Sequence, residues 1–121
     1  MDIRSVAVIG GGTMGSGIAA ACATADRDVI LLDASQELAE KALGRVTAQA
    51  KDDAERARFR KRITIGSIDS DLPRLAQCDW ICEAVIEDLA IKRDILAHVE
   101  KVRRDGSIVS TNTSGIPLRA I

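Results

Sequence analysis

Short apolar runs alternate with longer amphipathic stretches along this chain, and the two patterns predict different elements. Five runs rich in Val, Ile and Leu have the length of buried strands, and they span residues 3–9, 29–32, 63–65, 80–85 and 107–111. Three stretches place apolar residues three or four positions apart, as one face of a helix requires, and they span 13–25, 35–50 and 88–103. Strands that alternate with helices favour a doubly wound α/β fold, with a mostly parallel sheet and helices on both faces.

The remaining segments carry weaker signals. Residues 51–62 form a charged stretch without a clear periodicity, and residues 71–77 are interpreted as a short turn or helix. A polar loop follows the fifth strand, and Pro117 suits the first turn of a further helix. Because the sequence ends at Ile121, barely one turn into that helix, we expect a single domain over residues 1–121, truncated after its fifth strand and cut from a longer protein.

A glycine-rich turn joins the first predicted strand to the first helix. Residues 10–15 have the sequence Gly-Gly-Gly-Thr-Met-Gly and fit the pattern G-x-G-x-x-G. In this pattern Gly10 permits a tight turn, Gly12 admits a pyrophosphate to the backbone, and Gly15 lets the helix pack closely on the strand. The N–H groups at the start of the helix then hold the phosphates. We therefore predict a Rossmann-type dinucleotide site.

An acid at the end of the second predicted strand completes the pattern. Asp33 lies 18 positions after Gly15, where its carboxylate can accept hydrogen bonds from the adenosine ribose. The same charge repels a 2′-phosphate, and neither Ala34 nor Ser35 supplies a cation to neutralise one. The sequence therefore predicts NAD rather than NADP. The alternative is a turn without ligand, in which Asp33 only caps a helix.

Composition limits the partners and the cellular compartment that we expect for the protein. Lys and Arg number 17 against 18 Asp and Glu, so a net charge of −1 gives no reason to expect nucleic acid or a membrane surface as partner. No apolar run approaches the ~20 residues of a membrane span, and residues 1–9 lack the features of a signal peptide. The three cysteines lie in apolar segments with a single histidine, His98, which favours buried thiols in a reducing compartment over a metal site. We expect a cytoplasmic protein without a metal.

Three strings extend the prediction beyond a generic dinucleotide site. VIGGGTMGSGIA at residues 8–19, DWICEAVIEDLAIKRDIL at 79–96 and SIVSTNTSGIPL at 107–118 resemble the N-terminal domain of the 3-hydroxyacyl-CoA dehydrogenase family. The second string carries the E-A-x-x-E-x-x-x-x-K pattern of that family, and the third carries its N-T-S loop. The resemblance covers nearly the whole chain in order and spacing. It implies NAD-dependent oxidation of the 3-hydroxyl group of a 3-hydroxyacyl-CoA, as in fatty-acid β-oxidation.

The resemblance also implies roles for individual residues. The residues that it adds to the cofactor site are Thr13, Met14, Ala84, Val85, Glu87, Lys92, Asn112 and Ser114. It places the backbone of Met14 at the pyrophosphate, and Glu87 and Lys92 near the nicotinamide ribose. It places Ser114 beside the nicotinamide, where its hydroxyl donates to the reacting oxygen and stabilises developing charge. In the alternative interpretation Glu87 and Lys92 are ordinary surface charges, and the loop at 112–114 satisfies its own backbone.

On the substrate side the resemblance is incomplete. The general base of the family is a histidine that follows the N-T-S loop in a His-Phe-Phe-Asn-Pro segment, whereas this sequence ends seven residues after Ser114. The only histidine, His98, falls on the polar side of a predicted helix. The C-terminal helical domain of the family, which completes the acyl-CoA site and usually a homodimer interface, is absent as well. We therefore expect this chain to bind NAD without turning over substrate.

Residues 51–62 hold six basic and three acidic side chains, a local balance of +3. In the family, Ser and Lys side chains of the second helix and the following turn contact the phosphates of CoA. Arg56 lies near one such lysine position, whereas Gln49 stands near the serine. Contact between CoA and Arg56 or Arg60 is therefore one hypothesis, and a solvated charged face is the other.

Two further functions fit the same glycine turn. β-Hydroxyacid and 6-phosphogluconate dehydrogenases also carry Met-Gly there, but they lack the pairing of E-A-x-x-E with N-T-S, and their NADP-dependent members have Asn-Arg in place of an acid. A non-catalytic NAD-binding protein of the same fold is the second alternative, because fold does not fix function. Because we expect the chain to be truncated, we also expect the fifth strand to be an open edge that promotes concentration-dependent self-association.

Overall fold

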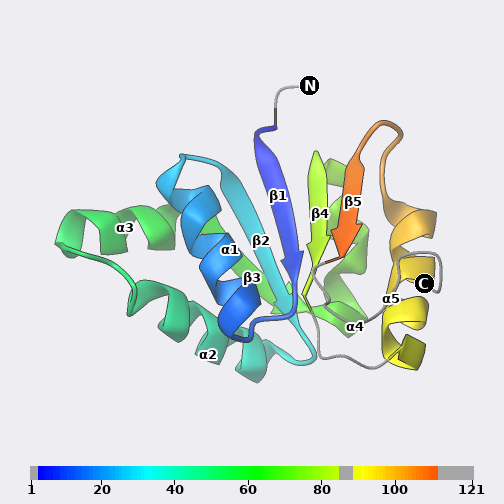
Figure 1. Ribbon diagram of the computed structural model, residues 1–121, viewed down its shortest axis with the longest axis horizontal. Coiled ribbons are helices and arrows are strands. Elements are labelled where there is room, and N and C mark those ends of the chain that lie inside the picture. Colours follow the sequence, from blue (N-terminus) through cyan, green and yellow to red (C-terminus); the bar gives the residue numbers. More distant parts are fainter. Residues whose placement is uncertain (1–2, 85–88, 112–121) are drawn as a thin grey trace.

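The computed structural model describes residues 3–84 and 89–111, and its centre is a five-stranded parallel sheet (Figure 1). The strands are β1 (Ser5–Ile9), β2 (Asp28–Asp33), β3 (Ile63–Ser67), β4 (Trp80–Glu83) and β5 (Ile108–Thr111). They lie in the order β3-β2-β1-β4-β5, and every neighbouring pair is parallel. The chain moves outward from β1 to β3 and then returns to pair β4 with the other side of β1. Ligands of such sheets bind at the carboxyl ends of the strands, where the order reverses.

Helices cover both faces of this sheet (Figure 1). One layer consists of α1 (Thr13–Thr24), α2 (Gln36–Thr47) and α3 (Asp53–Arg62). The other consists of α4 (Ile68–Asp71), the 3₁₀ helix η1 (Leu72–Gln77) and α5 (Leu89–Val102). Alternate residues of β1 serve the two layers, because Val6 and Val8 pack in the first core and Ala7 and Ile9 in the second. The doubly wound α/β fold predicted from the sequence is therefore confirmed.

Most predicted elements are found within a few residues of their expected bounds. The predicted strand at 29–32 extends to Asp33, and the strand at 63–65 extends through Gly66 and Ser67. Ser35 caps α2 as expected, since its side chain accepts a hydrogen bond from the backbone N–H of Leu38 at 3.2 Å. The segment at 71–77 is largely the 3₁₀ helix.

The sequence predicted no element for the charged stretch at 51–62, and most of it is the helix α3. The side chain of Asp52 caps its first turn by accepting from Glu55 N at 2.8 Å, and the basic residues gather in its last turn. A single buried side chain, Phe59, anchors the helix in the first core. Arg62 contributes an ion pair to Asp28 of β2 at 3.1 Å. A helix held by one aromatic residue and charges has no apolar stripe for sequence analysis to detect.

The thiols of Cys78 and Cys82 are buried, as predicted, whereas that of Cys22 is half-buried. Burial raises the pKa of the Cys78 thiol to about 11, despite the nearby guanidinium groups of Arg74 and Arg104. These thiols therefore stay protonated at neutral pH and act as small apolar groups.

Candidate dinucleotide-binding site

The glycine turn lies at the carboxyl end of β1, and its three predicted glycines occupy three different environments. Gly10 has φ of +104°, a conformation that side chains rarely adopt. A Cβ atom added at Gly15 would lie 1.8 Å from the Gly10 carbonyl oxygen, so α1 packs directly on the turn. A Cβ added at Gly12 would meet no atom within 4 Å. The turn is thus closed at Gly15 and open at Gly12, as backbone contact with a pyrophosphate requires.

The start of α1 leaves backbone donors available at this turn. Gly12 is the N-cap, and no side chain there forms a capping hydrogen bond. The first turn of α1 contains no acidic residue that would compete with a bound anion. Met14, on the same turn, exposes 57% of its surface. The backbone N–H groups and the positive end of the helix can therefore meet a phosphate.

Asp33 lies beside this turn at the end of β2. Its Oδ2 accepts a hydrogen bond from Gly11 N at 3.1 Å, and its Oδ1 accepts one from Ala34 N at 2.7 Å. The two bonds orient the carboxylate while leaving it partly exposed. Further lone pairs of both oxygens remain for hydroxyl donors of a ribose. The sequence placed Asp33 at this strand end, and the structure brings it to the glycine turn.

These residues share one cleft of about 540 Å³. Of the predicted cofactor residues it brings together Gly10, Gly12, Thr13, Met14, Asp33 and Ala84. Its walls also include residues that sequence analysis did not propose, namely Gly11, Ala34, Leu38, Arg45, Ile68, Ile91 and Ile95. The last two come from α5, so the cleft extends from β2 across β1 to the helix that follows β4.

Gly11 and Arg45 are the most informative of the missed residues. A Cβ at Gly11 would approach the Cβ of Ala42 to 2.3 Å, so α2 lies against the turn and excludes any side chain there. Arg45, one turn further along α2, donates to the Gly11 carbonyl oxygen. Its signal in the sequence is only a basic residue on the second helix, and nothing local links it to a turn 34 positions earlier.

Lys92 corrects one alternative from the sequence, because it is a buried residue and not a surface lysine. Its Nζ lies 2.6 Å from Glu83 Oε2, and both side chains are fully buried. Thr111 of β5 donates to the other oxygen of Glu83. This cluster joins α5, β4 and β5, and Glu83 and Lys92 are sequence neighbours of Ala84 and Ile91, which line the cleft.

Several predicted site residues fall elsewhere. Val85, Glu87, Asn112 and Ser114 lie outside the described residues. His98 is on the exposed side of α5, where its Nδ1 lies 2.8 Å from the Asp94 carbonyl oxygen, as its surface assignment predicted.

The two candidate CoA contacts, Arg56 and Arg60, are on α3 and do not line the cleft. Arg56 forms an exposed ion pair with Asp53 at 2.6 Å. Arg58 and Arg62, on the opposite side of the helix, pair with Asp26. The structure therefore divides the basic residues of α3 between two faces.

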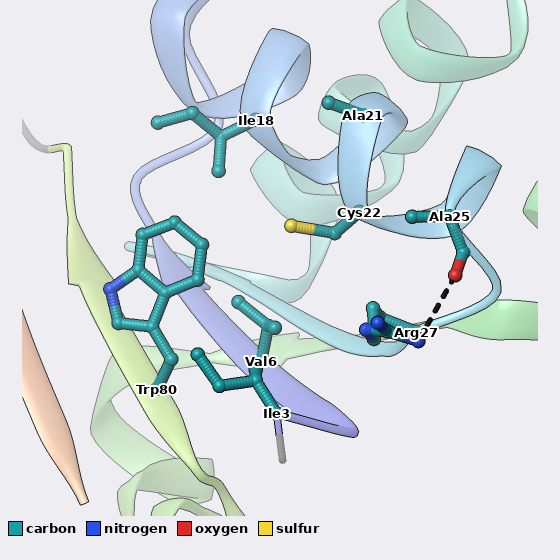
Figure 2. Close-up of a pocket in the computed structure, with 8 residues that line it drawn as sticks. All are labelled: Ile3, Val6, Ile18, Ala21, Cys22, Ala25, Arg27 and Trp80. Atoms are coloured by element: carbon teal, nitrogen blue, oxygen red, sulfur yellow. Dashed lines mark hydrogen bonds between the residues drawn. The ribbon is translucent and has the colours of Figure 1, made fainter. Parts of the chain in front are cut away.

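A second hollow of about 450 Å³ lies at the amino ends of the strands, away from the glycine turn (Figure 2). Its lining is almost entirely apolar: Ile3, Val6, Ile18, Ala21, Cys22, Ala25, Arg27 and Trp80. Figure 2 shows the Trp80 ring of β4 facing Ile18 and Cys22 of α1, with no carboxylate or hydroxyl group among the eight side chains drawn. A dinucleotide needs such polar partners, so we assign it to the glycine cleft instead.

Within the described residues, no helix is long and apolar enough to cross a membrane. The same part of the chain contains no group of three or more His, Cys, Asp or Glu side chains suited to hold a metal ion.

Known proteins resemble this chain in sequence and in fold. The family of the 3-hydroxyacyl-CoA dehydrogenase NAD-binding domain matches residues 5–121. A probable 3-hydroxyacyl-CoA dehydrogenase of Deinococcus radiodurans is 40% identical over 98% of this chain and 36% of its own length. A peroxisomal fatty acid beta-oxidation multifunctional protein of Arabidopsis thaliana is 36% identical over 98% of this chain and 17% of its own length. The crystal structure of 3-hydroxybutyryl-CoA dehydrogenase from Escherichia coli superposes with a TM-score of 0.85 at 33% identity, covering 99% of this chain and 26% of that one.

The chain thus spans between 17% and 36% of the length of these relatives. The family match covers residues 5–121 of this chain and so includes the glycine turn. The open Gly12, the carboxylate of Asp33 and the cleft between them agree with the cofactor named by the matching family. The chain belongs to the 3-hydroxyacyl-CoA dehydrogenase family, as an NAD-binding domain.

Proposed function

We propose that this chain is the NAD-binding part of an enzyme that transfers a hydride between NAD and the 3-hydroxyl or 3-keto group of an acyl-CoA. The observation that carries the proposal is the placement of Asp33 and the open Gly12 in one cleft. The names of the relatives supply the reaction class, since they include 3-hydroxyacyl-CoA and 3-hydroxybutyryl-CoA dehydrogenases. The strings at 79–96 and 107–118 support the same assignment over the β-hydroxyacid and 6-phosphogluconate dehydrogenases.

The chain offers a separate group to each part of the cofactor. Asp33 accepts hydrogen bonds from the adenosine ribose, and the N–H groups at Gly12 and Met14 bind the pyrophosphate. The wall formed by Ala84, Ile91 and Ile95 accommodates the nicotinamide half. NAD supplies the hydride acceptor, and an apolar wall beside it keeps water from the reaction.

Residues beyond the described part of the chain, together with the buried Lys92, complete this proposal. Glu87 is proposed to contact the nicotinamide ribose, with Asn112 nearby, and Lys92, which pairs with Glu83, is proposed to act near the same ribose. Ser114 is proposed to donate a hydrogen bond to the substrate oxygen, which stabilises the negative charge that develops there during hydride transfer. The pattern E-A-x-x-E-x-x-x-x-K and the N-T-S loop support these roles.

Calorimetric titration with NADH and NADPH tests the cofactor site. We expect NADH to bind in the micromolar range and NADPH much more weakly, because the carboxylate of Asp33 repels a 2′-phosphate. Gly12→Val places a side chain in the open space of the turn, at a residue with φ of −69°, so the fold should persist while NADH affinity falls at least about tenfold.

Gly17→Ala is the matched control, because a Cβ at Gly17 also meets no atom within 4 Å but lies inside α1. It should leave NADH affinity unchanged. A folded wild-type chain that binds no NADH would contradict the proposal. So would equal losses from the two glycine substitutions.

The substrate side rests on the same family assignment. We expect the 121-residue polypeptide alone to produce no NADH from hydroxyacyl-CoA and NAD above a blank, since its only histidine, His98, is exposed on α5 away from the cleft. Robust turnover would show that another group is the base. In the complete enzyme, which we propose to be a homodimer, Arg56 and Arg60 are candidate contacts for the CoA phosphates. Unchanged acyl-CoA affinity after Arg56→Ala and Arg60→Ala would rule out these two arginines as CoA contacts.

A further inference from the structure

The carbonyl oxygen of Gly11 accepts hydrogen bonds from three donors. Ser16 Oγ donates at 2.9 Å, Arg45 Nε at 3.0 Å, and Arg45 Nη2 donates as well. Ser16 is a buried residue of α1, whereas Arg45 reaches the turn from α2. The N–H group of the same residue donates to Asp33. Three elements therefore hold Gly11: α1, α2 and the end of β2.

The guanidinium group of Arg45 donates its hydrogen bonds to this carbonyl oxygen. Within the described part of the chain its guanidinium forms no ion pair, although the neighbouring Lys41 on the same helix pairs with Glu37 at 3.8 Å. Arg45 also lines the cleft itself. An arginine that donates through two nitrogens of its planar guanidinium fixes both the distance and the direction of its acceptor.

Fixing the Gly11 oxygen also fixes the next N–H group. The C=O of Gly11 and the N–H of Gly12 belong to one planar trans peptide, so they point in opposite directions. Glycine residues on both sides of this peptide would otherwise allow it to rotate with little steric hindrance. Because Arg45 and Ser16 hold the oxygen, they also fix the direction of the N–H of Gly12, the residue at which the turn has open space.

We infer that Arg45 is a positioning residue, which holds the Gly11–Gly12 peptide in the orientation that binds the pyrophosphate of the dinucleotide. This inference rests on the proposed NAD site and adds a residue of the second helix to it. The effect of Arg45 acts through the backbone of the turn. It should therefore be confined to ligands that carry the phosphate and be visible in the free protein.

Hydrogen exchange of the ligand-free chain gives the first test. Arg45→Met should accelerate exchange of the Gly11 amide, which donates to Asp33, measured by NMR, while amides in β1 keep their protection. Arg45→Lys keeps the charge but loses the planar pair of donors, so it should accelerate exchange at the same amide. Lys41→Met removes a positive charge from the exposed side of the same helix and should leave the exchange of this amide unchanged.

Binding of ADP-ribose and adenosine gives the second test. Both ligands reach Asp33 through the ribose, but only ADP-ribose carries a pyrophosphate. Arg45→Met should weaken ADP-ribose binding about fivefold to tenfold, the loss expected when charge-assisted hydrogen bonds at a partly exposed site are removed. Adenosine binding, followed by NMR titration, should stay within twofold of wild type. If the long-range charge of Arg45 were responsible, Arg45→Lys would restore ADP-ribose affinity in full.

The possible outcomes separate the two proposals. Unchanged exchange at Gly11 in Arg45→Met, equal losses for both ligands, or full restoration of ADP-ribose affinity by Arg45→Lys would overturn the role of Arg45. A wild-type chain that binds neither NADH nor ADP-ribose would instead contradict the proposed NAD site, and the exchange experiment would still decide whether Arg45 orders the turn. If Arg45→Met does not fold, Arg45→Lys provides the same comparisons.

Discussion

Replacing Lys92 by methionine removes the cation that pairs with Glu83 in the buried ion pair near the cleft. The Nζ and Oε2 atoms lie 2.6 Å apart and neither side chain is exposed, so water cannot replace the lost partner. Two unit charges about 4 Å apart attract by about 4 kcal/mol at an effective dielectric constant of ~20. Breaking a buried pair on one side costs about 3–5 kcal/mol. We therefore expect Lys92→Met to lower the free energy of unfolding by about 3–4 kcal/mol.

Urea denaturation followed by circular dichroism measures this loss as a shift in midpoint. The double variant Lys92→Met with Glu83→Gln removes both charges while keeping an acceptor for Thr111, so it should be more stable than Lys92→Met alone. Lys41→Met is the matched control, since Lys41 forms an exposed pair with Glu37 and should change stability by at most about 0.5 kcal/mol. Equal destabilisation by Lys92→Met and Lys41→Met would refute the argument, as would additive effects of the two buried substitutions.

Three other predictions concern the turn, the thiols and the sheet edge. Gly15→Ala should destabilise the chain by about 1–3 kcal/mol in urea titrations, because its Cβ would overlap the Gly10 carbonyl oxygen, whereas Gly17→Ala should be neutral or slightly stabilising. Burial raises the pKa of Cys78 to about 11, so this thiol loses its proton more readily in the unfolded chain than in the folded one. The free energy of unfolding should therefore fall as pH rises from 9 towards 11, and the same pH dependence in a Cys78→Ala chain would contradict this. The edge strand β5 exposes Ile108, and Ile108→Lys should reduce concentration-dependent self-association in light scattering; a monomeric wild type at high concentration would exclude the edge as a contact.

The sequence predicted the elements whose signal is local. The strands and the turn were recognisable because buried parallel strands are continuous apolar runs and because each glycine of the turn has its own steric requirement. Asp33 was recognisable because it lies 18 positions after Gly15 in the sequence, at the end of the second predicted strand. The structure confirms that these residues share one cleft.

The contacts that the sequence did not reveal depend on how elements pack together. Lys92 was named as a cofactor residue, and only the packing of α5 on β4 shows that it pairs with Glu83. Arg45 contacts a turn that the linear sequence separates from it by a strand and a helix. The helix α3 was missed because ion pairs and one aromatic residue, and not an apolar stripe, hold it in place.

The two hydrogen bonds of Asp33 have a consequence for attempts to exchange the cofactor. The carboxylate that would repel the phosphate of NADP also receives the N–H groups of Gly11 and Ala34. Substituting a small neutral residue, the usual first step in converting such a site to NADP, would therefore leave Gly11 N without its acceptor and loosen the turn. Cofactor preference and the order of the turn are thus coupled through one side chain. Asp33→Asn keeps one acceptor oxygen. A conversion from NAD to NADP should therefore begin with this substitution and add a positively charged residue on α2.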